Sequence, residues 1–152
     1  MSWTSRRTAK LGTGDWMKSN DYVRRAGIKQ IVSTTIDLDQ IAASYDLFTG
    51  AVQDGVLESL VIRLPNVDCS DDAALTSISI QTDDVTPDVV ISAANGAVAN
   101  LTAEAQLKYT GAVFIKVGTK VQLTIAGGAA DATTVCDVVA IFTADSDGGY
   151  LA

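Results

Sequence analysis

The sequence predicts an all-β protein, an antiparallel β-sandwich of jelly-roll or immunoglobulin-like kind with roughly seven or eight strands and at most one short helix. Apolar and β-branched segments alternate with turn residues at intervals of about 8–12 residues, a spacing typical of such sandwiches. One segment alone has helical character, so helices are too few to connect parallel strands in a βαβ arrangement. The 152 residues, 47% of them apolar and 19% charged, suffice for one domain with an ordinary core.

Local composition predicts the first four strands. Residues 31–38 form a β-branched run, IVSTTIDL, which is favoured on a pleated surface. Residues 45–48 form a short second strand, and residues 56–64 form an apolar third strand that Pro65 stops. Residues 75–82 alternate as a half-buried strand does, with isoleucines on one face and serine or glutamine on the other.

The next two segments differ in character. Residues 89–92 form a fifth strand, which follows the acidic turn DDVTP. Residues 100–109, with the sequence NLTAEAQLKY, are the helical candidate. We expect Asn100 to cap this helix and Glu104 to suit the positive end of its dipole.

A hairpin and a long final strand complete the predicted sandwich. Residues 113–117 and 120–125 flank a two-residue Gly-Thr turn with glycine first, as a type II′ hairpin turn prefers. A Gly-Gly pair ends the second of these strands, and residues 133–143 supply the last strand. We expect Asp137, which interrupts the apolar run of that strand, to lie on its solvent face.

Charge divides the chain into two parts. Residues 1–30 hold seven basic and two acidic side chains, a net charge of +5, whereas residues 31–152 hold four basic and sixteen acidic ones, a net charge of −12. Both tryptophans lie in the first part. Such asymmetry is typical of an interaction arm attached to a globular body. We therefore predict a basic N-terminal arm over residues 1–30 and an acidic β-sandwich domain over residues 31–152.

The composition argues against catalysis. The chain has no histidine, which excludes histidine-based triads, histidine metal ligands and imidazole acid–base chemistry. No S-x-x-K motif offers a lysine base to a serine, and nine aromatic side chains are few for a sugar-binding cleft. Cys69 and Cys136 match no zinc framework and are expected to be reduced, buried thiols. We therefore expect no enzyme and no cofactor.

Aspartates cluster in three predicted loops, NVDCSDDAA, QTDDVTPDVV and TADSDGGY, and carboxylates in loops are ligands that calcium prefers. The third resembles the opening of a calcium loop with Asp145 and Asp147 as candidate ligands, but it lacks the third acidic position and the distal glutamate. Carboxylates that bond the backbone at tight turns explain the same residues, so we expect no bound metal. A calcium-dependent carbohydrate- or ligand-binding module stays as the alternative function.

The arm is the predicted binding element. Its tryptophans would serve as apolar anchors and its arginines as paired cations, in the set Trp3, Arg6, Arg7, Trp16, Arg24 and Arg25. Nucleic acid is disfavoured as a partner because the acidic body repels a polyanion. The favoured partner is an acidic protein surface or the body of another copy, since arm and body carry opposite charge.

Two further classes of segment are not predicted. No run of roughly 18 apolar residues is present, so we expect no membrane span. No apolar segment follows the N-terminal charges either, so we expect no signal peptide.

The body also resembles a known class of proteins. Its strands are rich in small residues, as in LTSISIQTDDVTPDVVISAANGAV and FIKVGTKVQLTIAGGAADATTV, histidine is absent, and a basic arm is set apart. In these features the chain resembles small virion proteins of tailed bacteriophages, in particular head decoration or fibre-type proteins built on a β-sandwich. The resemblance implies a symmetric homo-oligomer, most often a trimer, attached to a capsid or tail surface of a virion assembled in the host cytoplasm. No collagen-like or coiled-coil shaft is evident, which argues against a long fibre. We therefore expect a non-enzymatic structural protein of a phage-like particle that self-associates and is anchored through its N-terminal arm.

Overall fold

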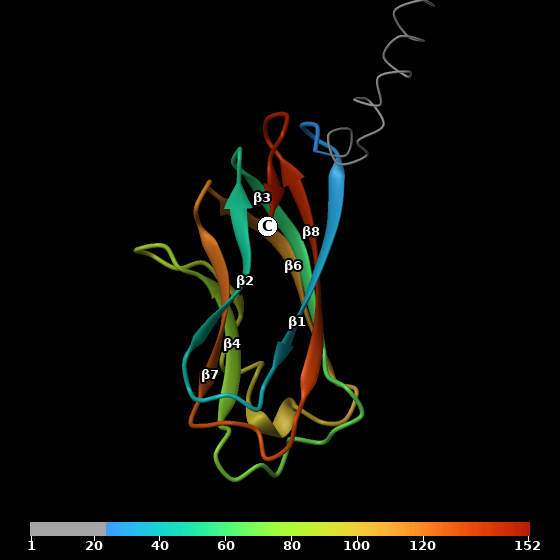
Figure 1. The fold of residues 1–152 in the computed structure, drawn as a ribbon, viewed down its shortest axis with the longest axis vertical. Coiled ribbons are helices and arrows are strands. Elements are labelled where there is room, and N and C mark those ends of the chain that lie inside the picture. Colours follow the sequence, from blue (N-terminus) through green and yellow to red (C-terminus); the bar gives the residue numbers. More distant parts are fainter. Residues whose placement is uncertain (1–23) are drawn as a thin grey trace, which may run out of the picture.

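The computed structural model describes residues 24–152, which form a two-layered β-sandwich with its long axis along the strands (Figure 1). The all-β antiparallel fold that the sequence predicts is confirmed. The described strands are β1 (Lys29–Asp37), β2 (Ser44–Ala51), β3 (Gly55–Arg63), β4 (Ser77–Thr82), β5 (Val89–Ile91), β6 (Gln106–Ile115), β7 (Lys120–Ala126), β8 (Val135–Ala144) and β9 (Tyr150–Leu151).

The order of the strands identifies the sandwich as a jelly roll. One sheet has the order β1-β8-β3-β6 and the other β5-β4-β7-β2-β9. β1 pairs with β8, β2 with β7, β3 with β6 and β4 with β5, all antiparallel, as in one long hairpin that is rolled up on itself. The pairs β3·β8 and β4·β7 close the roll. The immunoglobulin-like alternative keeps its first two strands in one sheet, whereas β1 and β2 lie in different sheets here.

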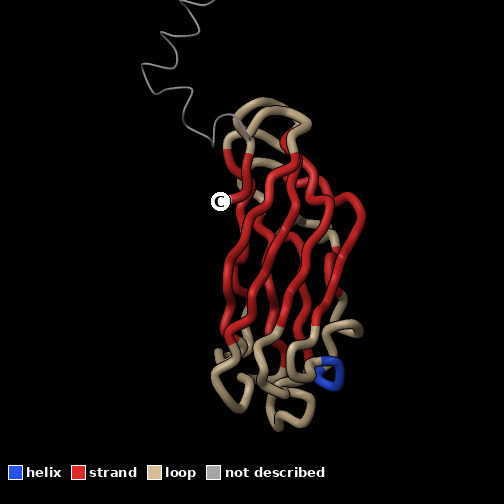
Figure 2. The backbone as a smooth tube through the Cα atoms, turned by 90° about the vertical axis from the view of Figure 1, so that its right-hand side faces the viewer, coloured by secondary structure: helices blue, strands red, loops and turns tan. Residues whose placement is uncertain are grey.

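The core lies between the two sheets and is formed by alternate residues of each strand. In β4, Ile78 and Ile80 are fully buried between half-exposed polar neighbours, and β7 buries its apolar residues with the same period. Phe142 of β8 is among the largest fully buried side chains. The loops gather at the two ends of the sandwich, as Figure 2 shows in a view onto the four-stranded sheet.

The predicted helix over residues 100–109 is wrong. A single 3₁₀ turn, Val98–Asn100, precedes an irregular segment, and Gln106 already begins β6. Glu104 has a left-handed φ of 57°, which no α-helix accommodates. Leu107 and Tyr109 pack against the core from β6, so pairing with β3 overrides the helical propensity of this segment. No helix in the described part of the chain is long and apolar enough to cross a membrane.

The predicted hairpin at the Gly-Thr turn is also wrong, because the strands on either side belong to different sheets. β6 pairs with β3, and β7 pairs with β2 and β4. Thr119 N–H donates to the Lys116 carbonyl at 3.0 Å, and Gly118, in the third position of this turn, has a φ of 88°. Glycine at the third position is the type II pattern, which splays the flanking strands where a type II′ turn would align them.

Contacts with the β2–β3 region hold this corner in place. Gly50 N–H donates to the Thr119 carbonyl and Gly118 N–H donates to the Gly50 carbonyl, both at 2.9 Å. Asp54 Oδ1 accepts the N–H of Val117 at 2.8 Å. The turn therefore carries the chain from one layer of the sandwich to the other.

Candidate functional site

The base of the predicted arm is fastened to the C-terminal end of the domain. The Arg24 carbonyl accepts the N–H of Gly148 at 2.7 Å, and the Arg24 guanidinium lies 3.6 Å from the centre of the Tyr150 ring. Ala26 N–H donates to Asp147 Oδ1 at 2.9 Å, so this candidate calcium ligand holds the chain where it enters β1. Arg24 and Ala26 are thus held at a defined place beside the C-terminal segment that ends in β9.

The structure places two of the six predicted binding residues. Arg24 is half-buried and Arg25 is exposed, and the Arg25 carbonyl accepts the N–H of Ile28 at 3.1 Å. The other four, Trp3, Arg6, Arg7 and Trp16, lie outside the described residues.

A cavity of about 330 Å³ opens beside the base of the arm. It lies between β1 of one sheet and β9 of the other, and its walls include Arg24, Ile31, Tyr150 and Leu151. Gln30 points inward next to it and donates from Nε2 to the Gly149 carbonyl at 2.7 Å. On this side of the sandwich, Arg24, the start of β1 and the C-terminal residues Tyr150 and Leu151 therefore lie next to one another.

The outward face of the five-stranded sheet is polar. Asp46 accepts hydrogen bonds from Lys120 Nζ at 2.8 Å and from Gln122 Nε2 at 2.6 Å, and these bonds lower the pKa of the Asp46 carboxyl below its ordinary value. Ser44 and Thr124 share a hydroxyl hydrogen bond across the same two strands. The polar side chains of this face can be hydrated, so the face needs no protein partner to cover it.

The outward face of the four-stranded sheet carries an apolar patch over the neighbouring strands β1, β8 and β3. Ile31 of β1 is 75% exposed and Val139 of β8 is 40% exposed. The pairing register places Ile31 opposite Ile141, and Val139 opposite Val61, so these side chains adjoin one another across the sheet. Contiguous exposed apolar surface is characteristic of surfaces that bind other proteins.

Sequence reasoning missed this apolar face, although a signal for it exists. The outward phase of the final strand is largely apolar, with Val135, Val139 and Ile141 beside Asp137 and Thr143, and it alternates with buried residues that are apolar too. A strand that is apolar on both faces indicates that both faces meet other protein surface.

The carboxylates of the acidic loops accept backbone N–H groups, some from their own loop and some from a neighbouring segment. Ser70 N–H donates to Asp68 Oδ1 at 2.9 Å, and Lys120 N–H donates to Asp83 Oδ1 at 2.7 Å. Asp72 Oδ2 accepts the N–H of Asp131 at 3.2 Å. Within residues 24–152, no three acidic or cysteine side chains converge on a common point that would hold a metal ion. The Asp68 contact fixes a tight turn, and the Asp83 and Asp72 contacts join their loops to neighbouring segments. Asp137 is exposed on β8, as predicted.

The two thiols are free and buried, as predicted. Burial raises the pKa of the Cys136 thiol to about 12, and burial together with the nearby Asp72 and Asp68 carboxylates raises the pKa of Cys69. A thiolate is the reactive form of cysteine, so neither side chain is prepared to act as a nucleophile at neutral pH.

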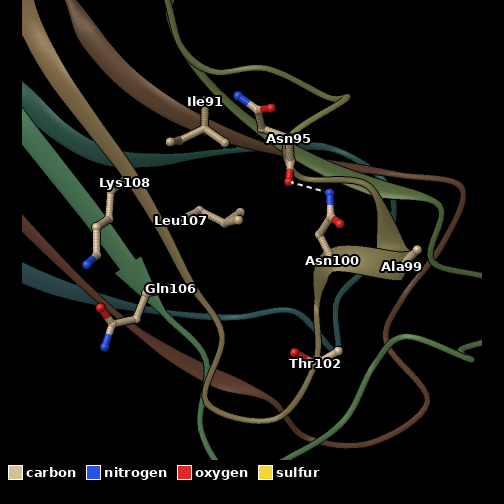
Figure 3. Close-up of a pocket in the computed structure, with 8 residues that line it drawn as sticks. All are labelled: Ile91, Asn95, Ala99, Asn100, Thr102, Gln106, Leu107 and Lys108. Atoms are coloured by element: carbon tan, nitrogen blue, oxygen red, sulfur yellow. Dashed lines mark hydrogen bonds between the residues drawn. The ribbon is translucent and has the colours of Figure 1, made fainter.

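A cavity of about 460 Å³ is lined by residues of β5, of β6 and of the connection between them (Figure 3). Asn100 Nδ2 donates to the Asn95 carbonyl across one side of it at 3.1 Å. Lys108 is the one ionisable side chain among the described residues that line it. The cavity offers polar contacts and no acid–base pair.

Taken together, the topology and the surfaces define a jelly-roll protein with an apolar patch on the outward face of its four-stranded sheet. No protein-family model matches the chain, and no curated protein is similar to it in sequence. Solved structures are similar in fold. A chain in the acid-stable capsid structure of Helicobacter pylori bacteriophage KHP30 matches 84% of this chain over 94% of its own length, with a TM-score of 0.53 and 8% identity.

A chain of the capsid asymmetric unit of cyanophage Pam1 gives a second match. It covers 78% of this chain and 86% of its own length, with a TM-score of 0.54 and 16% identity. Both matches span most of either chain, so the likeness extends over the whole sandwich. They confirm the jelly-roll β-sandwich, and they show that chains of two phage capsid structures share it.

Proposed function

We propose that this chain is a non-enzymatic structural protein of a phage-like particle, which decorates or stabilises a capsid or attaches to its surface. The observation that carries the proposal is the match in fold, over nearly their full length, to chains of two phage capsid structures. The apolar outward face and the surface-fastened arm root support it, because both are features of a protein that binds other protein surfaces.

The finer parts of the proposal concern self-association and anchoring. The chain associates with itself, and the basic arm anchors the assembly to an acidic capsid or tail surface. Arg24 and Arg25 mark the root of that arm, and Trp3, Arg6, Arg7 and Trp16 belong to its more distal part. Opposite net charge on arm and body, +5 against −12, favours such docking.

Co-sedimentation with purified particles tests the anchoring. The particles come from a phage strain that lacks this chain, and the purified chain is added back. The wild-type chain should sediment with the particles, whereas the variant Arg6→Glu/Arg7→Glu should stay in the supernatant. The matched control is Lys108→Glu/Lys116→Glu, which changes net charge equally but alters two exposed body positions. Equal sedimentation of both variants would show that the arm is not the anchor.

A calcium titration addresses the alternative function. A metal that binds only the folded state raises the melting temperature as its concentration rises. We expect no rise at millimolar calcium, because the loop carboxylates of Asp68, Asp83 and Asp147 already accept backbone N–H groups. A rise that Asp145→Asn/Asp147→Asn removes would favour the calcium-binding module.

A further inference from the structure

β1 is an open and unprotected sheet edge. It borders the four-stranded sheet, and among residues 24–152 it pairs on one side only, with β8. Its register with β8 is unbroken over nine residues, whereas β6 at the opposite edge pairs with β3 through a bulge. Edge strands are normally blunted by bulges, proline, shortness or charges along their length. β1, with the sequence KQIVSTTID, carries charge only at its two ends.

The backbone groups that face the open edge follow from the hydrogen bonds of β8. Leu38 N–H, just after β1, donates to the Thr134 carbonyl at 2.9 Å, in register with the β1·β8 pairing. In an antiparallel ladder, residues that bond the neighbour alternate with residues whose N–H and C=O point away. The even-numbered residues of β1 therefore bond β8, and Lys29, Ile31, Ser33 and Thr35 direct their backbone groups to the edge.

The same residues direct their side chains to the outward face. Lys29, Ile31, Ser33 and Thr35 are exposed, whereas Gln30 and Ile36 between them are buried. Ile31 is the most exposed of these apolar side chains, at 75%. A strand added at this edge would thus satisfy free backbone groups and also cover part of the apolar face.

The sequence of β1 is complementary to itself when reversed. In an antiparallel pair centred on Ser33, Ser33 lies opposite Ser33 of a second copy, and Ile31 lies opposite Thr35. Lys29 then lies opposite Asp37, and symmetry repeats this pairing at the other end. Within one chain Lys29 Nζ donates to Glu58 Oε2 at 2.9 Å, and Asp37 Oδ1 accepts the N–H groups of Asp39 and Thr134. The pairing between copies therefore requires the exposed Lys29 side chain to exchange Glu58 for the second carboxylate oxygen of Asp37. A shift of one or two residues removes both charge pairs and shortens the overlap. Opposite charges placed directly across two strands stabilise their pairing.

We propose that two copies of this chain pair through β1, antiparallel about a two-fold axis at Ser33, and so join their four-stranded sheets into one continuous sheet. The inference rests on the proposed self-association and names the surface that performs it. The contact is isologous, which gives a dimer in place of the trimer that the resemblance implies. The apolar faces of the two copies then lie on the same side of the joined sheet.

Disulfide trapping tests the register. Opposite residues in a hydrogen-bonded antiparallel pair have Cα atoms about 5.5 Å apart, within the range that a disulfide spans. Ser33→Cys should therefore form a covalent dimer under mild oxidation. The matched control is Thr35→Cys, which is also exposed. In this register residue 35 of one copy lies about 14 Å from residue 35 of the other copy. We expect the control to cross-link at least tenfold more slowly, and the buried native thiols to take no part. Equal rates, or no cross-linking of Ser33→Cys, would overturn the proposed pairing.

The mass in solution tests the contact without new thiols. The wild-type chain should have twice its 15.9 kDa mass by light scattering, and Ser33→Lys, which places two cations at the two-fold axis, should have the mass of one chain. Ser79→Lys, on the polar outward face of the five-stranded sheet, should remain a dimer with the wild-type melting temperature. A wild-type mass of one chain or of three chains overturns the β1 contact.

Co-sedimentation with particles separates this inference from the proposed function. A monomeric or trimeric wild-type chain that still sediments with particles overturns the β1 pairing alone. A dimeric wild-type chain that does not sediment with any particle overturns the structural role alone. In an alternative arrangement, the N-terminal arm of a second copy would pair with the edge of β1. The two copies of residue 33 would then not meet, and neither would the two copies of residue 35, so neither cysteine variant would form a covalent dimer. This outcome also overturns the proposed pairing.

Discussion

Alanine substitutions at two neighbouring valines of β8 test which face of the strand belongs to the core. Val138 is completely buried between the sheets, whereas Val139 is 40% exposed on the outward face. Each substitution removes two methyl groups, about 1.6 kcal/mol of transfer free energy if they are fully buried. At Val138 a cavity term adds to this, for a total of roughly 2–3 kcal/mol, because the packed interior relaxes only in part. At Val139 the loss should be below about 1 kcal/mol, since water fills the space.

Urea and thermal unfolding measure the difference. For a domain of this size, each kcal/mol corresponds to a shift in melting temperature of about 2–4 °C, so Val138→Ala should melt roughly 5–10 °C below the wild type and Val139→Ala only about 1–3 °C below. The urea dependence of the unfolding free energy should stay the same in all three proteins. The two substitutions are chemically identical, so they serve as controls for one another. Equal losses, or a larger loss at Val139, would show that the burial assigned to β8 is wrong.

Three further results are expected. Burial raises the pKa of Cys136 to about 12 from 9.0, a roughly 1000-fold loss of thiolate at pH 8, so neither it nor Cys69 should react with an aromatic disulfide reagent until urea unfolds the chain. Rapid labelling of the folded protein would contradict this. Gly118→Ala should lower the free energy of unfolding in urea by about 1 kcal/mol, because alanine is strained at the φ of 88° that Gly118 has. No other atom lies near the added methyl carbon, so backbone strain is the whole cost. Gly127→Ala should cost more, because at a φ of 84° the added carbon also meets a neighbouring carbonyl, and equal losses would refute the steric part of this argument. Hydrogen bonds from a lysine and a glutamine lower the pKa of Asp46, so its contribution to stability is present above its ordinary value of 3.8 and is lost as the pH falls through the folded value. The melting temperature of Asp46→Asn should therefore fall less on acidification than that of the wild type, and parallel curves would count against the interaction.

Most strands could be predicted from the sequence because their signals are local. The run IVSTTIDL and the alternation in LTSISIQT are each favoured on a pleated surface whatever lies beside them, and both form strands at nearly the expected residues. The segment NLTAEAQLKY has helical propensity of about the same strength, yet it contributes to β6. Propensity there amounts to a few tenths of a kcal/mol per residue, and pairing with β3 together with burial of Leu107 outweighs it.

The candidate surfaces were predictable only in part. The charge division is a property of composition and predicts the arm; the structure shows that Arg24, within the predicted arm, contacts Tyr150 and Gly148. The apolar outward face and the open edge of β1 were not predictable, because each depends on which strand lies next to which. Asp137 marks the solvent face of β8, so alternation already separates Val138 in the core from Val139 on the surface. The sequence does not show that Val139 and Ile141 lie beside Val61 and Ile31 on neighbouring strands.

By itself the amino-acid sequence determined the all-β class, the buried thiols and the separation of a basic segment from an acidic body. These follow from composition and from contacts within a few residues. Only the tertiary structure decided that Gly118 turns a corner between sheets, that the sandwich is a jelly roll, and that β1 has one neighbouring strand among residues 24–152. The physical reason is that strand pairing joins residues far apart in the chain, as Lys29 and Thr143 are, and the free energy of such pairs depends on the whole arrangement.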